Sequence, residues 1–185
     1  MQNLTSEDFA NTGLLPADSS AAATTLHLIS GENLADFTNS LSPTDQQWLT
    51  RQSFTAKAGQ VAWLENGDGV LGKADADSLA TLGHMPYRLP EGVYRLAEAT
   101  TFIALLGWGL GSYSFSRYKA AERGPAQLIL PESADAAELV NTVAATYLTR
   151  DLINTPAQDM APSHLQAEVE ALATTFEASV STVVG

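Results

Sequence analysis

The sequence predicts an α/β fold with three layers, in which helices cover both faces of a mixed β-sheet. Three observations support this prediction. In TTLHLIS, residues 24–30, Leu26 and Leu28 alternate onto one face, as they would in a strand. Apolar runs flank the Asn-Gly pair at 66–67, which readily adopts the positive φ of a tight antiparallel hairpin. AQLILP, residues 126–131, is a continuous apolar run typical of a strand buried on both faces.

Composition and charge limit the class of protein. The 185 residues are 45% hydrophobic and 16% charged, which suits one folded domain and the beginning of a second. The net charge of -12 repels a phosphate backbone and argues against nucleic-acid binding. The close basic group formed by Arg117, Lys119 and Arg123 is interrupted by Glu122, and a solvated helix end explains it as well.

The chain contains no cysteine, which excludes disulfides, cysteine-based zinc sites and thiol nucleophiles, and is compatible with a reducing cytoplasm. Its first residues, MQNLTSEDF, carry acids rather than a basic leader. No stretch approaches the ~18 uninterrupted apolar residues of a membrane span. We therefore expect a cytoplasmic protein with no membrane partner.

The first half of the chain is expected to alternate strands with a helix. Residues 1–22 offer few apolar anchors and predict a flexible N-terminal arm. A helix is predicted after Ser42, whose side chain can accept from an orphan backbone N–H, with Pro43 at the first helical position. After the hairpin, two prolines mark a loop, and the residues from Val93 to Leu96 are expected to enter a short edge strand.

A glycine-rich helix is predicted from Thr100 to about Tyr118. Its expected buried stripe consists of Ile103, Leu106, Leu110 and Tyr113. The three glycines in GWGLGSY, residues 107–113, each cost roughly 1 kcal/mol relative to alanine, so close packing is expected to offset them. The run lacks the third glycine of a dinucleotide loop, and phosphate binding is not predicted there.

Two helical segments are expected towards the end of the chain. The first is capped by Ser133, has Asp135 in its first turn and extends to about Ile153. Its apolar side is expected to comprise Leu139, Val140, Val143, Ala144, Tyr147 and Leu148. The second, SHLQAEVEALATTF, places Leu165, Val169 and Leu172 on one face. ASVSTVV, residues 178–184, then predicts a strand that requires neighbours.

No catalytic residue and no metal ligand is predicted in this chain. The three histidines lack a second ligand at zinc-site spacing; they are His27, His84 and His164. His27 is expected to be an ordinary surface residue. Asp68, Asp75 and Asp77 lack the ligand order of a calcium loop and are expected to be solvated. The chain also lacks a nucleophile elbow and a lysine within an apolar run.

The segment GWGLGSYSFSRYK, followed by AQLILP and a long helix that ends in YLTRDLINTPAQDMAP, resembles the leucyl aminopeptidase family, also called cytosol aminopeptidases. LPEGVYRL is similar to a segment that precedes the glycine-rich helix in that family. The resemblance covers about residues 54–185. The signature positions, taken as structural, are Tyr113, Arg150, Asp151, Asn154, Pro156, Asp159 and Pro162.

This sequence departs from the family pattern at two positions near the second proline. Gln158 stands where asparagine is common, and Ala161 replaces a serine or threonine cap, so the helix that follows is expected to fray more easily. Pro156 and Pro162 stop one helix and start another, because proline lacks an N–H and clashes within a helix. We expect this hinge to lead into a further domain, and residue 185 to be a cut.

The resemblance implies a macro-domain-like N-terminal domain at residues 23–132, a connecting helix at 133–155, and the beginning of a truncated catalytic domain at 156–185. It implies a hydrolase that acts in proteolysis by releasing N-terminal amino acids from peptides. Two divalent metal ions, zinc or manganese, are implied for the missing catalytic domain, and a homo-hexamer for the full-length enzyme.

On this interpretation the isolated chain is not an enzyme. It is a non-catalytic domain that works with the catalytic domain of the same polypeptide, in assembly or in substrate access. The alternative hypothesis is a macro-like module that binds a nucleotide or another ligand.

Overall fold

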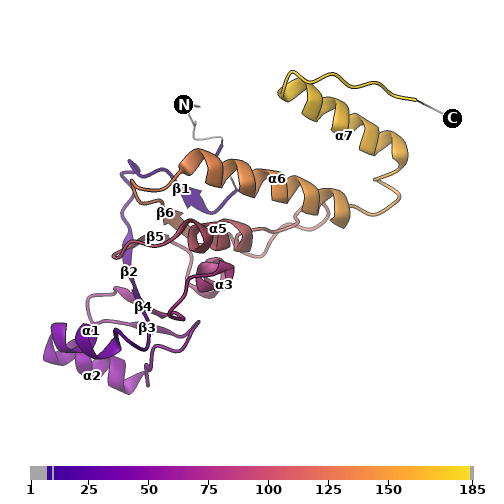
Figure 1. The fold of residues 1–185 in the computed structure, drawn as a ribbon. Helices are drawn as coiled ribbons and strands as arrows, with labels where there is room; N and C mark the ends of the chain where they lie inside the picture. Colours follow the sequence, from indigo (N-terminus) through magenta and orange to yellow (C-terminus); the bar gives the residue numbers. More distant parts are fainter. Residues whose placement is uncertain (1–7, 10, 184–185) are drawn as a thin grey trace. The chain divides into compact units, whose positions relative to one another are not determined.

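The computed structural model describes residues 8–9 and 11–183 (Figure 1). The chain divides into two compact units, with the boundary after Ala144. The long helix α6, Ala136–Asn154, begins in the first unit and ends in the second. No helix of the described residues is long and apolar enough to cross a bilayer.

The first unit is organised around a six-stranded sheet with the order β1-β6-β5-β2-β4-β3. Neighbouring strands are parallel, except that β3 and β4 are antiparallel. The strands are β1 Leu14–Leu15, β2 Thr24–Ile29, β3 Val61–Trp63, β4 Gly69–Gly72, β5 Val93–Leu96 and β6 Gln127–Ile129. The predicted α/β class with a mixed sheet is therefore confirmed.

Helices lie on both faces of this sheet. On one face, Ile29 and Val70 share a buried cluster with Leu49 of α2, and Phe37 of α1 packs against the same cluster. Successive side chains of a strand point to opposite faces of the sheet. The ring of Tyr94 lies on the other face, and its centroid is 6.4 Å from that of the Trp108 ring in α5. The bounds of these helices are α1 Leu34–Ser40, α2 Pro43–Arg51 and α5 Phe102–Gly111.

The start of α2 and the hairpin between β3 and β4 form as predicted. The Ser42 hydroxyl accepts from the N–H of Asp45 at 3.1 Å, and Pro43 is the first helical residue. Gly67 takes a φ of 89°, and Oδ1 of the Asn66 side chain accepts from the N–H of Asp68 at 3.0 Å. These local bonds are specified by residues close in sequence, which is why the sequence predicts them well.

The N-terminal segment contributes a strand, in contrast to the flexible arm expected over residues 1–22. Leu14 is fully buried, and the carbonyl of Gly13 accepts from the Trp108 indole N–H and from the Leu128 N–H, both at 2.9 Å. A two-residue strand has no sequence pattern of its own, because its partners lie far along the chain. The part of the expected arm at residues 1–7 and 10 lies outside the described residues.

Strand β5 lies inside the sheet, so the expected edge position is wrong. It pairs in parallel with β6 on one side and with β2 on the other. The two prolines before it remove no ladder hydrogen bond: Pro86 lies in the first turn of the short helix α4, Met85–Arg88, and Pro90 precedes the strand. Strand order depends on long-range pairing, which a local pattern does not encode.

Helix α5 is shorter than predicted and buries a different face. Ile103, assigned to the buried stripe, is 43% exposed, while Leu106, Leu110 and Tyr113 are only half-buried. The buried residues are Ala104, Leu105, Gly107, Trp108 and Gly109. A count of large apolar residues therefore selects the wrong side of a helix whose closest contacts are made by small residues.

The glycines of α5 permit close backbone contact, as expected. A Cβ added at Gly107 would meet the carbonyl of Leu79 in α3, Leu79–Leu82, and one at Gly111 would meet the carbonyl of Gly83. A Cβ at Gly109 would lie 2.5 Å from the side chain of Val143 in α6. One helix thus contacts α3 and α6 at distances that only glycine allows.

Helix α6 follows its predicted course with a different cap. The Asp135 carboxylate accepts from the N–H of Glu138 at 3.0 Å, so Asp135 takes the capping role expected for Ser133. An aspartate next to the first helical residue fits the positive end of the helix dipole as well as serine does. Leu139, Val140 and Val143 are buried, as predicted.

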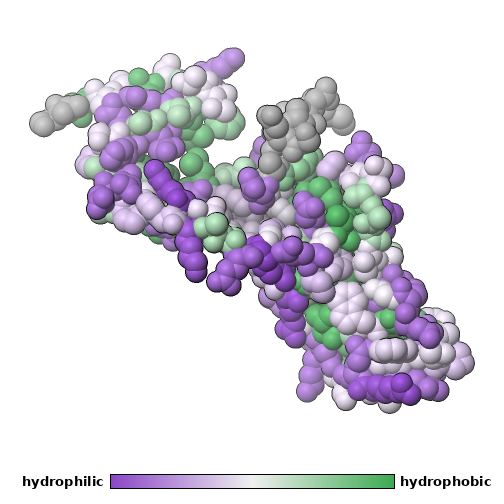
Figure 2. All heavy atoms as spheres, turned by 180° about the vertical axis from the view of Figure 1, so that it is seen from behind, coloured by the Kyte–Doolittle hydropathy of each residue, from purple (hydrophilic) through white to green (hydrophobic). Residues whose placement is uncertain are grey.

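The second unit contains the end of α6 and α7, Pro162–Thr175. At Ala161 the missing serine or threonine cap is partly replaced, because His164 Nδ1 accepts from the Ala161 N–H at 3.1 Å. Hydrophobic residues lie at the surface of this unit (Figure 2). They are Ile153, Leu165, Val169, Leu172, Phe176, Val180 and Val183.

The strand predicted over ASVSTVV does not form in its described part. Residues 178–183 are exposed and have no ladder partner, and position 184 lies outside the described residues. A strand needs a neighbour to satisfy its backbone groups, and alternation in the sequence does not supply one.

Gly107→Ala tests the contact between α5 and α3. The added methyl would press on the Leu79 backbone, so the free energy of unfolding should fall by about 1–3 kcal/mol, despite the better helix propensity of alanine. Urea unfolding followed by circular dichroism measures this change. Gly31→Ala is the control, because no atom lies within 4 Å of its added Cβ. Equal stability of Gly107→Ala and the parent would contradict the close contact.

Candidate functional site

Polar side chains gather at the carboxyl ends of β2, β4 and β5, the edge at which parallel α/β sheets commonly bind ligands. Lys73 directly follows β4, and Glu98 lies two residues after β5. Asp77 precedes α3, and Thr101 directly precedes α5. A ligand-binding site in the first unit would be expected at this edge.

The carboxylate of Asp77 is held by several donors. Lys73 Nζ lies 2.7 Å from one oxygen, and Thr101 donates to the other through its N–H at 3.3 Å and its hydroxyl at 3.0 Å. The Thr100 hydroxyl adds a bond of 3.2 Å. Burial raises the pKa of Asp77, but these hydrogen bonds and the charge of Lys73 outweigh burial and hold it below its usual value.

The Asp77 carboxylate occupies the N-terminus of α5. This end of a helix carries exposed N–H groups and a partial positive charge, and it commonly binds phosphate. Here the chain's own carboxylate accepts from the Thr101 N–H, so an incoming anion would meet a negative charge. The edge is therefore arranged to stabilise the fold, and it disfavours a phosphate group.

Asp77 differs from its predicted solvated state, because only 10% of its side chain is exposed. Asp68 differs as well: it is half-buried and accepts from the Thr25 N–H at 3.3 Å and from the Asn66 amide at 2.7 Å. Asp75 is exposed, as expected. The only sequence signal for the network at Asp77 was a lysine four residues earlier.

His27 also makes more contacts than predicted. Its Nδ1 lies 3.0 Å from Glu98, and its ring packs 5.2 Å from that of Phe37 in α1. The hydrogen bond to Glu98 raises the pKa of His27, burial opposes it, and the charges of Glu98 and Asp68 add to the rise. Only 22% of the His27 side chain is exposed, so it is not an ordinary surface residue.

Glu98 completes the hydrogen bonding of β2 beyond the end of β5. Its second carboxylate oxygen accepts from the Leu28 N–H at 2.8 Å. The register between β2 and β5 ends at Leu26 and Leu96, so the side chain replaces a backbone acceptor for this N–H. The pair of His27 and Glu98 is thus a structural contact rather than an acid and base with open positions.

Six of the seven family-signature residues lie close together in sequence, in the second unit. Arg150, Asp151 and Asn154 belong to the end of α6. The N–H of Asp159 donates to the Pro156 carbonyl at 2.8 Å, closing a turn before α7. Pro162 is the first residue of α7, whereas Tyr113 is half-buried just after α5, in the first unit. Their role as structural signature residues stays a prediction.

Thr155, which sequence reasoning did not single out, anchors this hinge. It is 5% exposed, and its hydroxyl and N–H both donate to the Asp151 carbonyl, at 2.7 and 2.9 Å. It therefore ends α6 with satisfied backbone groups directly before Pro156.

In the part of the chain that the structure describes, no three histidine, aspartate or glutamate side chains gather as metal ligands would. These residues do not fit the two divalent metal ions that the family resemblance implies. A depression of about 430 Å³ on α2 is lined by Pro43, Gln46, Gln47, Thr50 and Arg51. This lining contains a single charged group and no acid or base paired with it.

Comparison with known proteins decides the family. A family model described as the N-terminal domain of M17 aminopeptidases matches residues 24–131, which is more than half of the chain. The chain belongs to the M17 aminopeptidase family. The matched residues run from the start of β2 to just beyond β6, so the family assignment rests on the sheet and the helices that cover it. No curated protein matches the sequence.

Solved structures agree with the M17 assignment. The cytosol aminopeptidase from Coxiella burnetii superposes with a TM-score of 0.81 at 29% identity, over 91% of this chain and 39% of its own. A mutant of tomato leucine aminopeptidase gives 0.62 at 16% identity, over 89% and 42%. The bottromycin maturation enzyme BotP gives 0.58 at 21% identity, over 84% and 38%. The last two support the fold alone.

The chain spans about two fifths of the length of these three proteins. It therefore corresponds to the N-terminal domain of an M17 aminopeptidase, as the sequence resemblance implied. The comparisons add no support for a macro-like module that binds a nucleotide, and atoms of α3, Gly83 and α6 occupy the space beside the glycines of α5.

Asp77→Asn tests the network at the carboxyl edge through pH. Since the folded pKa of Asp77 is lowered, its ionised form stabilises the fold above the unfolded value of 3.8, and this stability is lost as pH falls through the folded pKa. The parent should therefore lose more stability than Asp77→Asn between pH 7 and pH ~2. Urea unfolding at both pH values measures the difference.

Asp75→Asn removes the same charge at an exposed residue two positions away and serves as the control. It should lose stability over this range as the parent does. If Asp77→Asn and the parent lost the same free energy of unfolding over this pH range, the stabilising role of the Asp77 network would be contradicted.

Proposed function

We propose that this chain is a non-catalytic domain of an enzyme that releases N-terminal amino acids from peptides. It acts with the catalytic domain of the same polypeptide, in assembly or in control of substrate access. The observation that carries this proposal is the match of residues 24–131 to an N-terminal domain, in a chain that spans two fifths of its relatives.

The polar groups of the described residues support a structural role. Lys73 and Thr101 both bind the Asp77 carboxylate at the start of α5, and Glu98 accepts from the Leu28 N–H of β2. A catalytic acid or base needs an open position within hydrogen-bond reach of a substrate. These groups instead use their bonding capacity within the fold.

The family resemblance suggests three further properties, which we propose for the full-length protein. Its catalytic domain would hold two divalent metal ions, zinc or manganese, and the assembly would be a homo-hexamer. A cytoplasmic location is supported by the name of the Coxiella burnetii relative, a cytosol aminopeptidase, and by the absence of cysteine. Residues 156–185, which lie within the second unit, would be the beginning of the catalytic domain.

The purified chain should show no turnover of leucine anilide with added manganese or zinc. The reason is that no three of its described histidine, aspartate or glutamate residues gather as metal ligands would. The measurement is a spectrophotometric assay against blanks that contain metal alone. A full-length M17 aminopeptidase in the same buffer is the positive control. Turnover that copurifies with the folded chain would contradict the non-catalytic assignment.

A further inference from the structure

The outer edge of β3 forms one end of the sheet. β3 is the last strand in the sheet order, and β4 is its neighbour on the inner side. The N–H of Leu64 donates to the Asp68 carbonyl at 2.8 Å, so the backbone groups of Leu64 face the inner side. Because such groups alternate between the two sides of a strand, those of Trp63 and Glu65 point outward. An outward row of this kind can pair with another extended chain.

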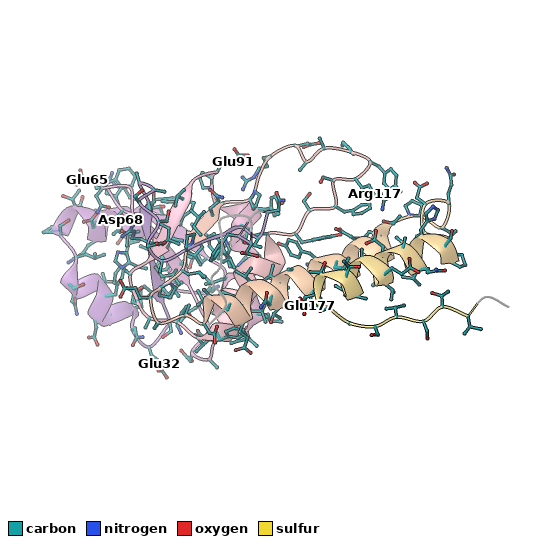
Figure 3. All side chains as sticks on the ribbon, turned by 90° about the horizontal axis from the view of Figure 1, so that it is seen from above. Glu32, Glu65, Asp68, Glu91, Arg117 and Glu177 are labelled. Carbon is teal, nitrogen blue, oxygen red and sulfur yellow. The ribbon has the colours of Figure 1, made fainter. Side chains whose placement is uncertain are left out.

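The residues of β3 favour such pairing. Residues 60–64 are QVAWL and contain no charged residue and no proline. Short segments of high strand propensity and low charge readily join other chains when their edge is open. Glu65, the first charged residue after this segment, lies at the end of the first unit that carries α1 and α2 (Figure 3). A soluble chain therefore has to cover the edge that precedes it.

The side chain of Gln52 binds both outward backbone groups of Trp63. The Trp63 N–H donates to Gln52 Oε1 at 2.9 Å, and Gln52 Nε2 donates to the Trp63 carbonyl at 2.7 Å. A carboxamide carries an acceptor and donors on one planar group, as the backbone of a neighbouring strand does. At this residue Gln52 thus takes the place of a further strand.

Helix α2 holds Gln52 against the edge. Gln52 directly follows α2, and its Nε2 also donates to the Trp48 carbonyl of that helix at 3.0 Å. Near the other end of α2, the Asp45 carboxylate accepts from the Glu65 N–H at 2.9 Å. Side chains from the two ends of α2 therefore bind successive outward positions of this edge.

The opposite edge of the sheet, at β1, also uses a side chain in this way. The Leu128 N–H of β6 donates to the Gly13 carbonyl, so the backbone groups of Leu14 point outward. The Leu14 N–H donates to the buried hydroxyl of Thr12 at 3.2 Å. At each edge of the sheet, a side chain of the same chain thus binds an outward N–H.

We propose that Gln52 closes the β3 edge to strand addition, and that without its side chain this edge pairs with the β3 edge of another copy. An identical edge supplies the N–H and carbonyl groups that Trp63 would then lack. This protection is independent of the non-catalytic role proposed above, and it requires no association of the parent chain.

Gln52→Ala tests the protection. In the dilute variant the Trp63 amide should exchange with solvent about three- to tenfold faster than in the parent, because it has lost its acceptor. When concentrated, the variant should aggregate more readily than the parent, as measured by light scattering and thioflavin T fluorescence. In the aggregates the Trp63 amide should again be protected, which hydrogen exchange with NMR detection after dissolution measures.

The matched control is Gln60→Ala, which removes the same carboxamide from a loop contact. Gln60 Oε1 accepts from the Thr55 N–H at 2.9 Å, and Nε2 donates to the Ser53 carbonyl at 2.8 Å, both between α2 and β3. Each variant is incubated at the urea concentration at which the two have the same free energy of unfolding. Gln60→Ala should then aggregate no faster than the parent.

Gln52→Glu separates edge pairing from the loss of a hydrogen bond. Its carboxylate can still accept from the Trp63 N–H but cannot donate to the carbonyl, and it places a charge at the edge. Charged side chains at a strand edge oppose pairing. This variant should therefore aggregate no faster than the parent, although it has lost a bond.

Aggregation of Gln52→Ala no faster than that of Gln60→Ala at equal stability would overturn the proposal. So would aggregation of Gln52→Glu as fast as that of Gln52→Ala. Aggregates in which the Trp63 amide exchanges as fast as in the dilute variant would show that the copies meet elsewhere. If the circular dichroism of Gln52→Ala showed an unfolded chain, the side chain would be needed for the fold rather than for the edge, which would overturn it too.

Discussion

The close approach of α5 to α3, α6 and the sheet is the contact on which the first unit depends. Gly107 and Gly111 bring the backbones of α5 and α3 together, and Gly109 admits a side chain of α6. From the same helix, the Trp108 indole reaches the carbonyl of Gly13 and thereby holds β1 in the sheet. A glycine helix is intrinsically weak, so its stability comes from the neighbours that its missing side chains admit.

The same helix explains why the carboxyl edge of the sheet disfavours an anionic ligand. Its N-terminus would attract an anion, and Asp77 provides one from within the chain, held in turn by Lys73. Polar groups that could serve a ligand in another α/β protein here join strands to helices.

The sequence predicts the features that depend on neighbouring residues. The cap at Ser42, the turn at Asn66-Gly67 and most of α6 follow from local patterns, as does the α/β class. Features that depend on distant contacts are missed, such as β1 and the interior position of β5. In α5 the search for large apolar residues fails for a physical reason: backbones that touch leave room only for small side chains, so the bulky Ile103 faces outward. The network at Asp77 was missed because two of its donors, Thr100 and Thr101, lie more than twenty residues away in sequence.

Native-state hydrogen exchange of the backbone amides of α5 tests the central role of this helix most directly. If α5 is held by its neighbours on both sides, its amides should exchange only when the whole unit unfolds, with the same opening free energy as those of the central strand β2. Exchange of α5 through a local opening of much lower free energy, while β2 stays protected, would show that the sheet stands without the helix and would contradict the account.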